Sequence, residues 1–213
     1  MKRHLQVQRI LETRFIAVIR AQSSEQLIDV GWALQEGGCD LIEVTMTTPD
    51  ALGVIERTVS ELGEKVLIGA GSVLDSETAR AAILSGAEYV VSPITDYDVI
   101  DMAHRYDKVV MPGAFTPTEV FDAYRAGADF VKIFPAEVGG PPYLKALKAP
   151  MPQLSLVPTG GVDLDTIIDF LKAGADACGV GSSLVKKEAL ASGNMDEIKN
   201  TAAAFLDKVR SVS

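Results

Sequence analysis

One hydrophobic and polar phrase recurs four times along the chain. An amphipathic stretch ends at a glycine, a small residue and an acidic residue follow, and a short apolar run begins. The glycines are Gly38, Gly86, Gly127 and Gly174, spaced by 48, 41 and 47 residues (86 minus 38, 127 minus 86, 174 minus 127). Glycine commonly ends helices because it adopts positive φ, and short continuous apolar runs are typical of strands covered on both faces. Each copy therefore predicts a joint between a helix and a buried strand.

Four further apolar runs lie between these joints, at 15–19, 66–70, 108–111 and 154–157. The gaps contain residues that begin helices, namely serine, threonine, aspartate and proline. These predicted helix starts lie at 23–24, 48–50, 75–76, 116–119 and 163–165. Thr116 and Glu119 also have the spacing of a capping box.

Eight strands alternating with helices predict one α/β domain over residues 1–213, a (β/α)8 TIM barrel. Residues 1–14 are expected to add an N-terminal helix, 15–183 to form the barrel strands and helices, and 184–213 to form C-terminal helices. An open doubly wound sheet is the alternative, but it accounts less well for eight strands with no linker or helix-only segment.

Composition narrows the class of protein. Hydrophobic residues make up 47% of the 213 residues and charged residues 23%, which excludes a disordered chain. The 20 Lys and Arg against 29 Asp and Glu give a formal charge of -9. This balance argues against partners such as nucleic acid or an anionic membrane surface. An anionic ligand would have to be held by a few local groups.

Targeting and redox signals are weak. Cys39 and Cys178 each lie in an apolar run, without the spacing of a zinc site or a disulfide framework, and we interpret them as buried thiols. The first residues form an amphipathic pattern rather than a signal sequence, and no apolar stretch has the length of a membrane span. A cytoplasmic location is the expectation.

Catalytic residues of such barrels lie at the C-terminal ends of the strands. Glu43 and Lys132 stand five positions after Gly38 and Gly127, so they share a register on strands two and six. Alternate strands at equal register form one interior layer, which would also contain Val91 and Gly179 and leave room for both side chains. Desolvation among apolar neighbours favours a neutral lysine, the nucleophile of Schiff-base chemistry, with Glu43 as acid and base. A structural ion pair is the alternative.

Other strand-end residues suggest how an anion is held. Thr159-Gly160-Gly161 and Gly181-Ser182 end strands seven and eight, where phosphate-binding barrels carry their phosphate site. Arg20 ends strand one and could hold a carboxylate, and the Ser72 hydroxyl could contribute. By contrast, Lys108 opens a strand and is expected at the opposite end of the barrel.

Several of these segments together resemble one enzyme family, the 2-keto-3-deoxy-6-phosphogluconate (KDPG) and 4-hydroxy-2-oxoglutarate (KHG) aldolases. The resemblance runs in order from about residue 15 to residue 185. The matching segments are Ile42-Glu43-Val44-Thr45, Gly69-Ala70-Gly71-Ser72-Val73, Ser92-Pro93, Met111-Pro112-Gly113, Thr116-Pro117-Thr118-Glu119, Val131-Lys132-Ile133-Phe134-Pro135-Ala136, Pro158-Thr159-Gly160-Gly161 and Gly181-Ser182.

The resemblance implies a class I aldolase on a (β/α)8 barrel, usually a homotrimer, with no metal and no cofactor beyond a covalent lysine Schiff base. It implies Lys132 as the Schiff-base residue and Glu43 as the proton shuttle. The implied substrate-binding residues are Arg20, Thr45, Ser72, Pro93, Phe134, Thr159, Gly160, Gly161, Gly181 and Ser182. One position departs from the pattern, because some members carry arginine where this chain has Thr47. Arg20 is the candidate replacement for binding the substrate carboxylate.

The implied reaction cleaves KDPG to pyruvate and glyceraldehyde 3-phosphate, with KHG cleavage to pyruvate and glyoxylate as a second activity. The galactonate epimer of the substrate stays open at this point. So do two other functions: a phosphosugar isomerase or epimerase that uses Glu43 without an imine, and a protein that binds a phosphorylated metabolite without turnover.

Overall fold

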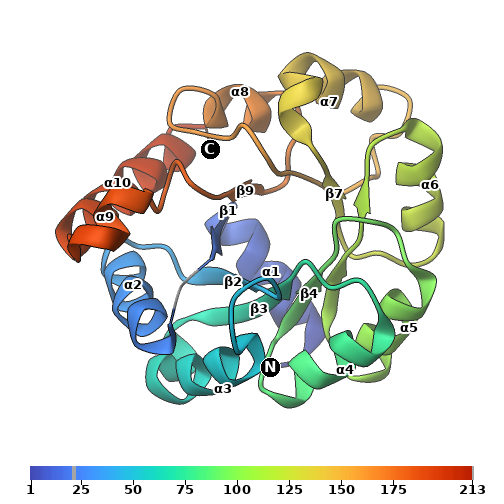
Figure 1. The fold of residues 1–213 in the computed structure, drawn as a ribbon. Coiled ribbons are helices and arrows are strands. Elements are labelled where there is room, and N and C mark those ends of the chain that lie inside the picture. Colours follow the sequence, from blue (N-terminus) through green and yellow to red (C-terminus); the bar gives the residue numbers. More distant parts are fainter. Residues whose placement is uncertain (21–22, 213) are drawn as a thin grey trace.

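The structure, a computed structural model, describes residues 1–20 and 23–212. It is an α/β fold in which curled parallel strands lie inside a ring of helices (Figure 1). In chain order the elements are α1 (Arg3–Thr13), β1 (Phe15–Ile19), α2 (Ser24–Glu36), β2 (Leu41–Thr45), α3 (Ala51–Leu62), β3 (Leu67–Gly71), α4 (Ser76–Leu84), β4 (Tyr89–Val91), α5 (Tyr97–Arg105), β5 (Val109–Met111), β6 (Gly113–Ala114), α6 (Pro117–Arg125), β7 (Val131–Ile133), α7 (Gly140–Lys148), β8 (Leu156–Pro158), α8 (Ile167–Lys172), β9 (Cys178–Val180), α9 (Lys187–Ser192) and α10 (Met195–Arg210). Short 3-10 helices occupy Gly63–Lys65 and Ala136–Val138.

The strands form two parallel sheets, one ordered β5-β4-β3-β2-β1-β9 and the other β6-β7-β8. Apart from β9, which returns to pair with β1, the strands follow one another as in the sequence, and the chain does not show the reversed order of a doubly wound sheet. The predicted run 108–111 continues past Pro112 into a second short strand. Thus β5 pairs with β4, while β6 pairs with β7.

Two seams connect the sheets. At the first, the backbone N–H of Asp129, just before β7, donates to the Val110 carbonyl of β5 at 3.2 Å. At the second, Thr159 and Gly179 form an isolated parallel bridge between the ends of β8 and β9. The sheets therefore meet on both sides of the three-stranded one.

The acidic residue of the repeated phrase has a structural role at these seams. The Asp129 carboxylate accepts the Val110 N–H at 3.0 Å, and the Asp176 carboxylate accepts the Leu156 N–H at 2.8 Å. Each carboxylate satisfies a backbone donor of the strand on the other side of the seam, Val110 in β5 and Leu156 in β8, which would otherwise lack a partner. This requirement explains why an acidic residue follows the small residue in these copies.

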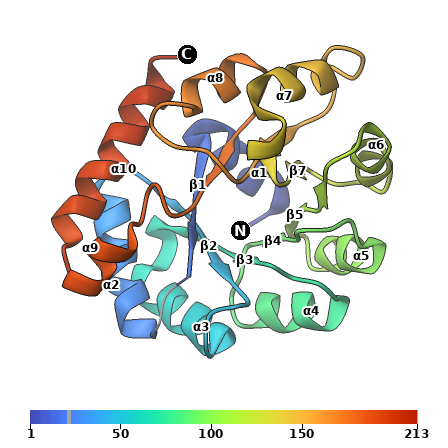
Figure 2. The same cartoon turned by 45° about the horizontal axis from the view of Figure 1, so that its top comes forward.

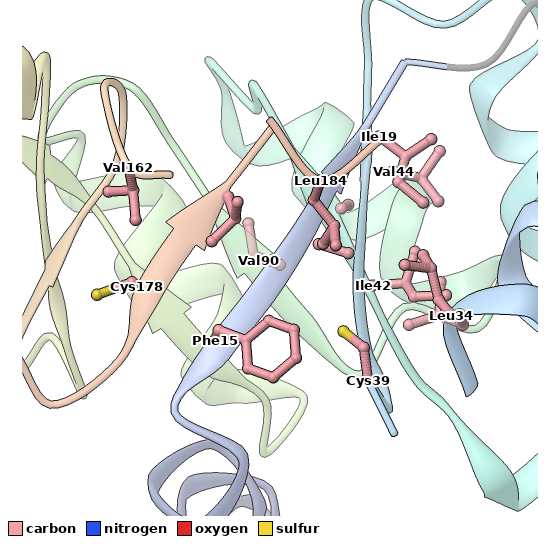
Figure 3. Close-up of a cluster of buried hydrophobic side chains, with 14 of the residues drawn as sticks. Phe15, Ile19, Leu34, Cys39, Ile42, Val44, Val90, Val162, Cys178 and Leu184 are labelled. Carbon is pink, nitrogen blue, oxygen red and sulfur yellow. The ribbon is translucent and has the colours of Figure 1, made fainter. Parts of the chain in front are cut away.

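Apolar side chains form two cores, one on each face of the strands. The larger lies between strands and outer helices and includes Phe15, Ile42 and both cysteines (Figure 3). The smaller fills the space enclosed by the strands and includes Leu41, Tyr89 and Phe130. Both thiols are fully buried, as predicted, and burial raises the pKa of Cys39 and of Cys178 to about 12.

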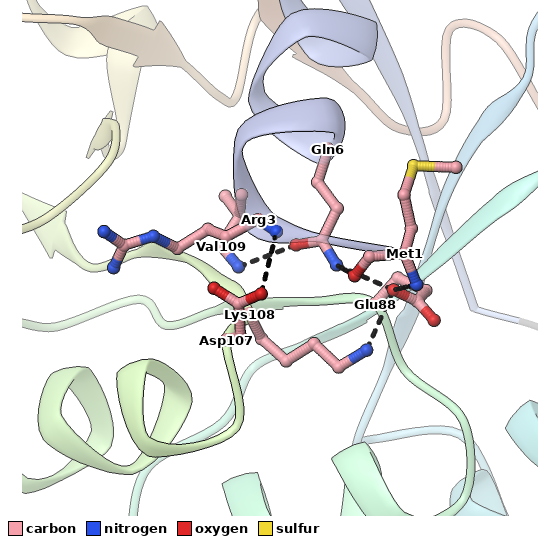
Figure 4. Close-up of polar contacts among 7 residues, drawn as sticks. All are labelled: Met1, Arg3, Gln6, Glu88, Asp107, Lys108 and Val109. Carbon is pink, nitrogen blue, oxygen red and sulfur yellow. Dashed lines mark hydrogen bonds and ion pairs between the residues drawn. The ribbon is translucent and has the colours of Figure 1, made fainter.

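Helix α1 lies across the N-terminal ends of the strands, and its Ile10 belongs to the inner core (Figures 1 and 2). A polar network fixes it there (Figure 4). The Gln6 amide donates to Glu88 at 2.7 Å and accepts the Val109 N–H at 3.0 Å, while Lys108 pairs with Glu88 at 2.8 Å. Lys108 thus lies at the end of the strands that the sequence predicts.

Helix boundaries test the predicted starts. Ser23, Asp75 and Thr116 accept backbone N–H groups as N-caps, and Thr116 with Glu119 forms the predicted capping box. Two predicted starts are too early. Helix α3 begins at Ala51 after Asp50 in the left-handed region, so Pro49 is not its first residue. Helix α8 begins at Ile167, because the Asp163 carboxylate binds the N–H groups of 165 and 166 in a turn.

The ends of the chain match their predicted elements, with α1 inside residues 1–14 and α9 and α10 inside 184–213. Within residues 1–20 and 23–212, none of the helices combines the length and apolar character needed to cross a lipid bilayer.

Candidate active site

Glu43 lies in the middle of β2, whose five residues are all buried. Its side chain is 3% exposed, and Oε1 has no hydrogen-bond partner among the described residues. Gly71 on β3 leaves the space that this carboxyl group occupies, since a Cβ atom there would overlap Oε1. Burial raises the pKa of Glu43, and the charges of Lys132 and Arg20 oppose that shift only in part. The group therefore holds a proton more readily than an exposed glutamate.

Lys132 lies on β7, between Gly113 of β6 and Val157 of β8 in register. It is 5% exposed, and its Nζ is 5.0 Å from the centroid of the Phe134 ring. No hydrogen bond or ion pair holds Nζ in the part of the chain that the structure describes. Its charge acts on Glu43 across the strand interior, although the two residues belong to different sheets. The structure thus brings together an amine and a carboxyl group that are both desolvated.

The space around this pair differs from the prediction. Gly179 was expected to leave room beside Glu43, but the Thr159 side chain occupies the space over Gly179. The room comes from Gly71, because the Glu43 side chain leans over β3. The reason is that parallel register is displaced from strand to strand, so equal distance from a repeated glycine does not identify direct neighbours.

Four predicted binding residues follow the strands near the pair. Thr45 ends β2 with its hydroxyl 2.8 Å from that of Thr47. Ser72 follows β3 with φ of 58°, a left-handed conformation that costs energy for a residue with a side chain. Pro93 follows β4 and is half-buried, and Phe134 is 39% exposed. All four thus lie at the C-terminal ends of strands that carry Glu43 or Lys132 or that follow them in the sheet.

The other predicted residues line a cavity of about 460 Å³ at the C-terminal ends of the strands. They include Arg20, which follows β1, and the residues that follow β8 and β9: Thr159, Gly160, Gly161, Gly181 and Ser182. Gly160 and Gly161 have φ of 95° and 71°, so glycine is required there. The volume suits a small metabolite.

Three charged residues that line this cavity are not among the site residues predicted from the sequence: Glu137, Asp163 and Lys187. They lie four to seven residues beyond the ends of β7, β8 and β9, in the segments before the next helix or, for Lys187, at the first residue of α9. Extending each strand end by one turn would have included Glu137 and Asp163. The sequence does not indicate Lys187 as a site residue, because it lies in the segment predicted to form the C-terminal helices.

Arg20 is well placed for the role that the Thr47 position leaves open. Thr47 is exposed and carries only a hydroxyl, whereas the exposed Arg20 lines the cavity and its charge reaches Glu43. A guanidinium can bind a carboxylate through two parallel hydrogen bonds. Within the described residues, no group of three or more His, Cys, Asp or Glu side chains is arranged to hold a metal ion.

Chemically, the arrangement suits attack on a carbonyl group. An uncharged amine can form an imine, a protonatable carboxyl group beside it can transfer protons, and the adjoining cavity offers backbone N–H groups and a guanidinium to an anion.

Comparison with known sequences gives a consistent family. The profile of the KDPG and KHG aldolases matches residues 7–201. The chain is 34% identical over 196 residues to the 2-dehydro-3-deoxy-6-phosphogalactonate aldolase of Escherichia coli K12, covering 92% of this chain and 94% of the relative. It is 33% identical over 198 residues to the 2-dehydro-3-deoxy-phosphogluconate aldolase of Pseudomonas aeruginosa, covering 92% and 90%.

Solved structures agree. A native KDPGal structure superposes with a TM-score of 0.87 at 33% identity, covering 93% of this chain and 95% of the other. A KDPG aldolase from Legionella pneumophila, with pyruvate captured as a covalent carbinolamine intermediate, superposes with a TM-score of 0.85 at 28% identity, covering 90% and 93%.

Proposed function

The chain belongs to the KDPG and KHG aldolase family and is an aldolase, and we propose that it cleaves KDPG to pyruvate and glyceraldehyde 3-phosphate through a Schiff base on Lys132. The observation that carries the proposal is that Lys132 and Glu43 are both buried, that the Lys132 charge acts on Glu43, and that Glu43 Oε1 has no hydrogen-bond partner among the described residues. We further propose KHG cleavage to pyruvate and glyoxylate as a second activity of the same site.

The reaction begins when the neutral amine of Lys132 attacks the ketone carbon of the 2-keto acid. The carbonyl oxygen takes a proton, and protonated Glu43 helps it leave as water, so that an iminium forms. Glu43, now ionised, accepts the proton of the hydroxyl on the fourth carbon. The bond between the third and fourth carbons breaks, the aldehyde leaves, and the electron pair enters the enamine. Glu43 returns the proton to the third carbon, and water hydrolyses the iminium to free pyruvate and Lys132.

The remaining contacts of the substrate divide between its two ends. Arg20, Ser72 and Thr45 are proposed for the carboxylate, and Pro93 and Phe134 for the walls around the imine. Thr159, Gly160, Gly161, Gly181 and Ser182 are proposed for the hydroxyl and phosphate end, which the backbone N–H groups of the cavity support.

The galactonate epimer of the substrate is a second candidate, because relatives of both kinds match this chain. Two galactonate aldolases are 34% and 37% identical to it, and the gluconate aldolase of P. aeruginosa is 33% identical. The two substrates differ in configuration at one carbon. Turnover of the two epimers at equal concentration, with pyruvate release as the readout, distinguishes these candidates.

The fold and assembly belong to the same proposal. We propose that residues 1–213 form one domain, a closed (β/α)8 barrel with α1 as an extra N-terminal helix, which the two hydrogen-bonded seams support. A homotrimer is proposed from the family, and the exposed Tyr97, Phe121 and Tyr124 offer apolar surface for self-association. We also propose a cytoplasmic location, a metal-independent reaction, and a small-molecule 2-keto acid as the partner.

Borohydride trapping tests the chemistry. Pyruvate with borohydride should reduce the imine to a stable secondary amine on Lys132, seen by peptide mass spectrometry, and should abolish turnover. Incubation with a chelator should leave turnover unchanged. If wild-type protein survives borohydride and pyruvate unmodified and active, the imine mechanism on Lys132 is wrong.

A further inference from the structure

Tyr89 is a buried tyrosine whose hydroxyl has no assigned purpose. It opens β4, is 0% exposed and belongs to the inner core among Leu41, Val109 and Phe130. Its Oη has no hydrogen-bond partner among the described residues. A phenylalanine would fill the same apolar space without burying a polar atom, and buried polar atoms are nearly always partnered. The hydroxyl therefore requires an explanation that packing does not give.

The register of the strands directs this hydroxyl toward Glu43. Gly69 of β3 pairs with Glu43 on one side and with Tyr89 on the other. Neighbouring strands lie about 4.8 Å apart. Glu43 on β2 and Tyr89 on β4 therefore lie on either side of β3, with their backbones about 10 Å apart. A Cβ atom at position 69 would overlap Cε2, Cζ and Cδ2 of the Tyr89 ring. The ring consequently lies across the bare backbone of Gly69, toward β2.

Glu43 presents the complementary atom. Its Oε1 is buried and also lacks a hydrogen-bond partner among the described residues. A phenol hydroxyl donates, and an ionised carboxylate only accepts. The two unsatisfied atoms thus belong to side chains on either side of one glycine, and they are a donor and an acceptor.

We propose that Tyr89 is a positioning residue whose hydroxyl donates a hydrogen bond, directly or through one enclosed water molecule, to the Glu43 carboxylate when that group is ionised. The inference rests on the proposed function of Glu43 as the proton carrier. Tyr89 does not touch the substrate in this proposal. It packs in the inner core together with Ile10 of α1, away from the C-terminal ends of the strands.

Such a bond would adjust the one group that must both give and take protons. Burial raises the pKa of Glu43, while Lys132 on β7 and Arg20 after β1 lower it. The titratable groups that act electrostatically on Tyr89 are Glu43 and, from the turn before β2, Cys39 and Asp40. A hydrogen bond to the ionised carboxylate favours that form, so Tyr89 would bring the proton affinity of Glu43 closer to the working pH.

The test is Tyr89→Phe, which removes the hydroxyl and keeps the ring. The readout is the exchange of pyruvate methyl protons with deuterated solvent, which requires only the imine and proton transfer by Glu43. At saturating pyruvate, the pH dependence of the rate reports groups of the complex. We expect the acidic limb to move up by about one pH unit and the rate below that limb to fall about tenfold, with KM for pyruvate within about twofold of wild type.

Tyr106→Phe is the matched control. The Tyr106 hydroxyl accepts a hydrogen bond from Arg80 at 2.9 Å on the outside of the molecule, so its loss should leave the pH profile unchanged. An acidic limb of folded Tyr89→Phe that coincides with that of wild type and of this control overturns the inference.

A second measurement uses the wild-type protein, so that it does not depend on the variant folding. With ¹³C at the tyrosine Cζ, the Tyr89 signal, assigned by its loss in Tyr89→Phe or by its protection from solvent, should shift with pH as Glu43 titrates. The shift should vanish in Glu43→Gln. A Tyr89 signal that ignores the ionisation of Glu43 also overturns the inference. Failure of the proposed function looks different, because wild-type protein would then neither exchange pyruvate protons nor form the borohydride adduct.

Discussion

The two ends of the strands hold similar charged side chains in opposite ways. At the N-terminal end, Lys108 pairs with Glu88, Arg9 with Asp40, and Lys148 with Asp176. At the C-terminal side, Lys132 and Glu43 are more deeply buried, yet neither has a hydrogen bond from the described residues. A buried charge costs free energy unless it is paired and hydrogen-bonded, so the groups without partners are the costly ones. The difference indicates which end is built for stability and which for chemistry.

The largest effect on turnover is expected when the lysine at the C-terminal end of the strands, Lys132, is removed. Lys132→Ala should lower turnover about 10⁴-fold or more, because the nucleophile is gone. Its free energy of unfolding should change only through the lost packing of the side chain, since Lys132 makes no ion pair among the described residues. Lys108→Ala is the matched control, and it should keep its turnover while losing stability. Coupled pyruvate release and urea denaturation measure the two quantities. A Lys132→Ala variant that turns over normally would remove the proposed chemical role of this end.

Glu43→Gln should lower turnover about 10² to 10⁴-fold, because it removes the acid and base. It should also change stability with a defined sign. Burial raises the pKa of Glu43 in the folded state, so the folded protein binds more protons and stability falls as pH rises above the unfolded value of about 4.3. The uncharged glutamine escapes this loss. Thermal denaturation should therefore show Glu43→Gln to be stabilised relative to wild type at pH 8 and not at pH 4.

A smaller effect is expected at the loop proposed to bind the phosphate, and it should leave the imine chemistry at Lys132 unchanged. A Cβ atom at Gly181 would have the Val18 carbonyl as its nearest neighbour, at 3.9 Å, so Gly181→Ala fits the fold and extends into the cavity. We expect KM for the phosphorylated substrate to rise about tenfold, with pyruvate proton exchange unchanged. Gly53→Ala, in the first turn of α3, is the control: its Cβ atom would displace only the Asp50 carboxylate, so both quantities should stay as in wild type. Equal KM values for Gly181→Ala and wild type would contradict the assignment of this loop.

The smallest effect on turnover is expected at α1. Gln6→Leu leaves the buried Val109 N–H without its partner and removes one of the three hydrogen bonds to Glu88 Oε2, which should lower the free energy of unfolding by about 1 to 3 kcal/mol and leave kcat unchanged. Burial raises the pKa of Glu88, but hydrogen bonds from Lys108 and the N-terminal ammonium outweigh it and hold the pKa low. This stability is present above the unfolded pKa of glutamate and is lost as pH falls. Urea denaturation should therefore show a lower free energy of unfolding at pH 4 than at pH 7. A change in kcat in Gln6→Leu would mean that the two ends of the strands are coupled.

The strands and the pair of reacting groups could be predicted from the sequence because they depend on local signals. Apolar runs after Gly38 and Gly127 fix the strands, and a charge inside such a run is conspicuous. The site around the pair was harder, since it depends on how strands are displaced relative to one another. That displacement explains why Gly71 rather than Gly179 gives room to Glu43.

Other features gave no local signal. The start of α3 could not be read from Thr48-Pro49-Asp50, because a left-handed Asp50 moves the first turn onward. Tyr89 looked like any apolar residue of a buried strand, and only the missing side chain of Gly69 reveals where its ring lies. Both depend on backbone conformation or on contacts between strands.

The separation of the strands into two sheets has a consequence for the timing of the reaction. Glu43 lies in the six-stranded sheet and Lys132 in the three-stranded one, so no single ladder of backbone hydrogen bonds fixes their separation. The backbone amides at the seams, such as that of Asp129 bound to the Val110 carbonyl at 3.2 Å, control it instead. We expect slow hydrogen–deuterium exchange at these amides, and a variant that accelerates exchange there should slow proton transfer even with every reacting group in place.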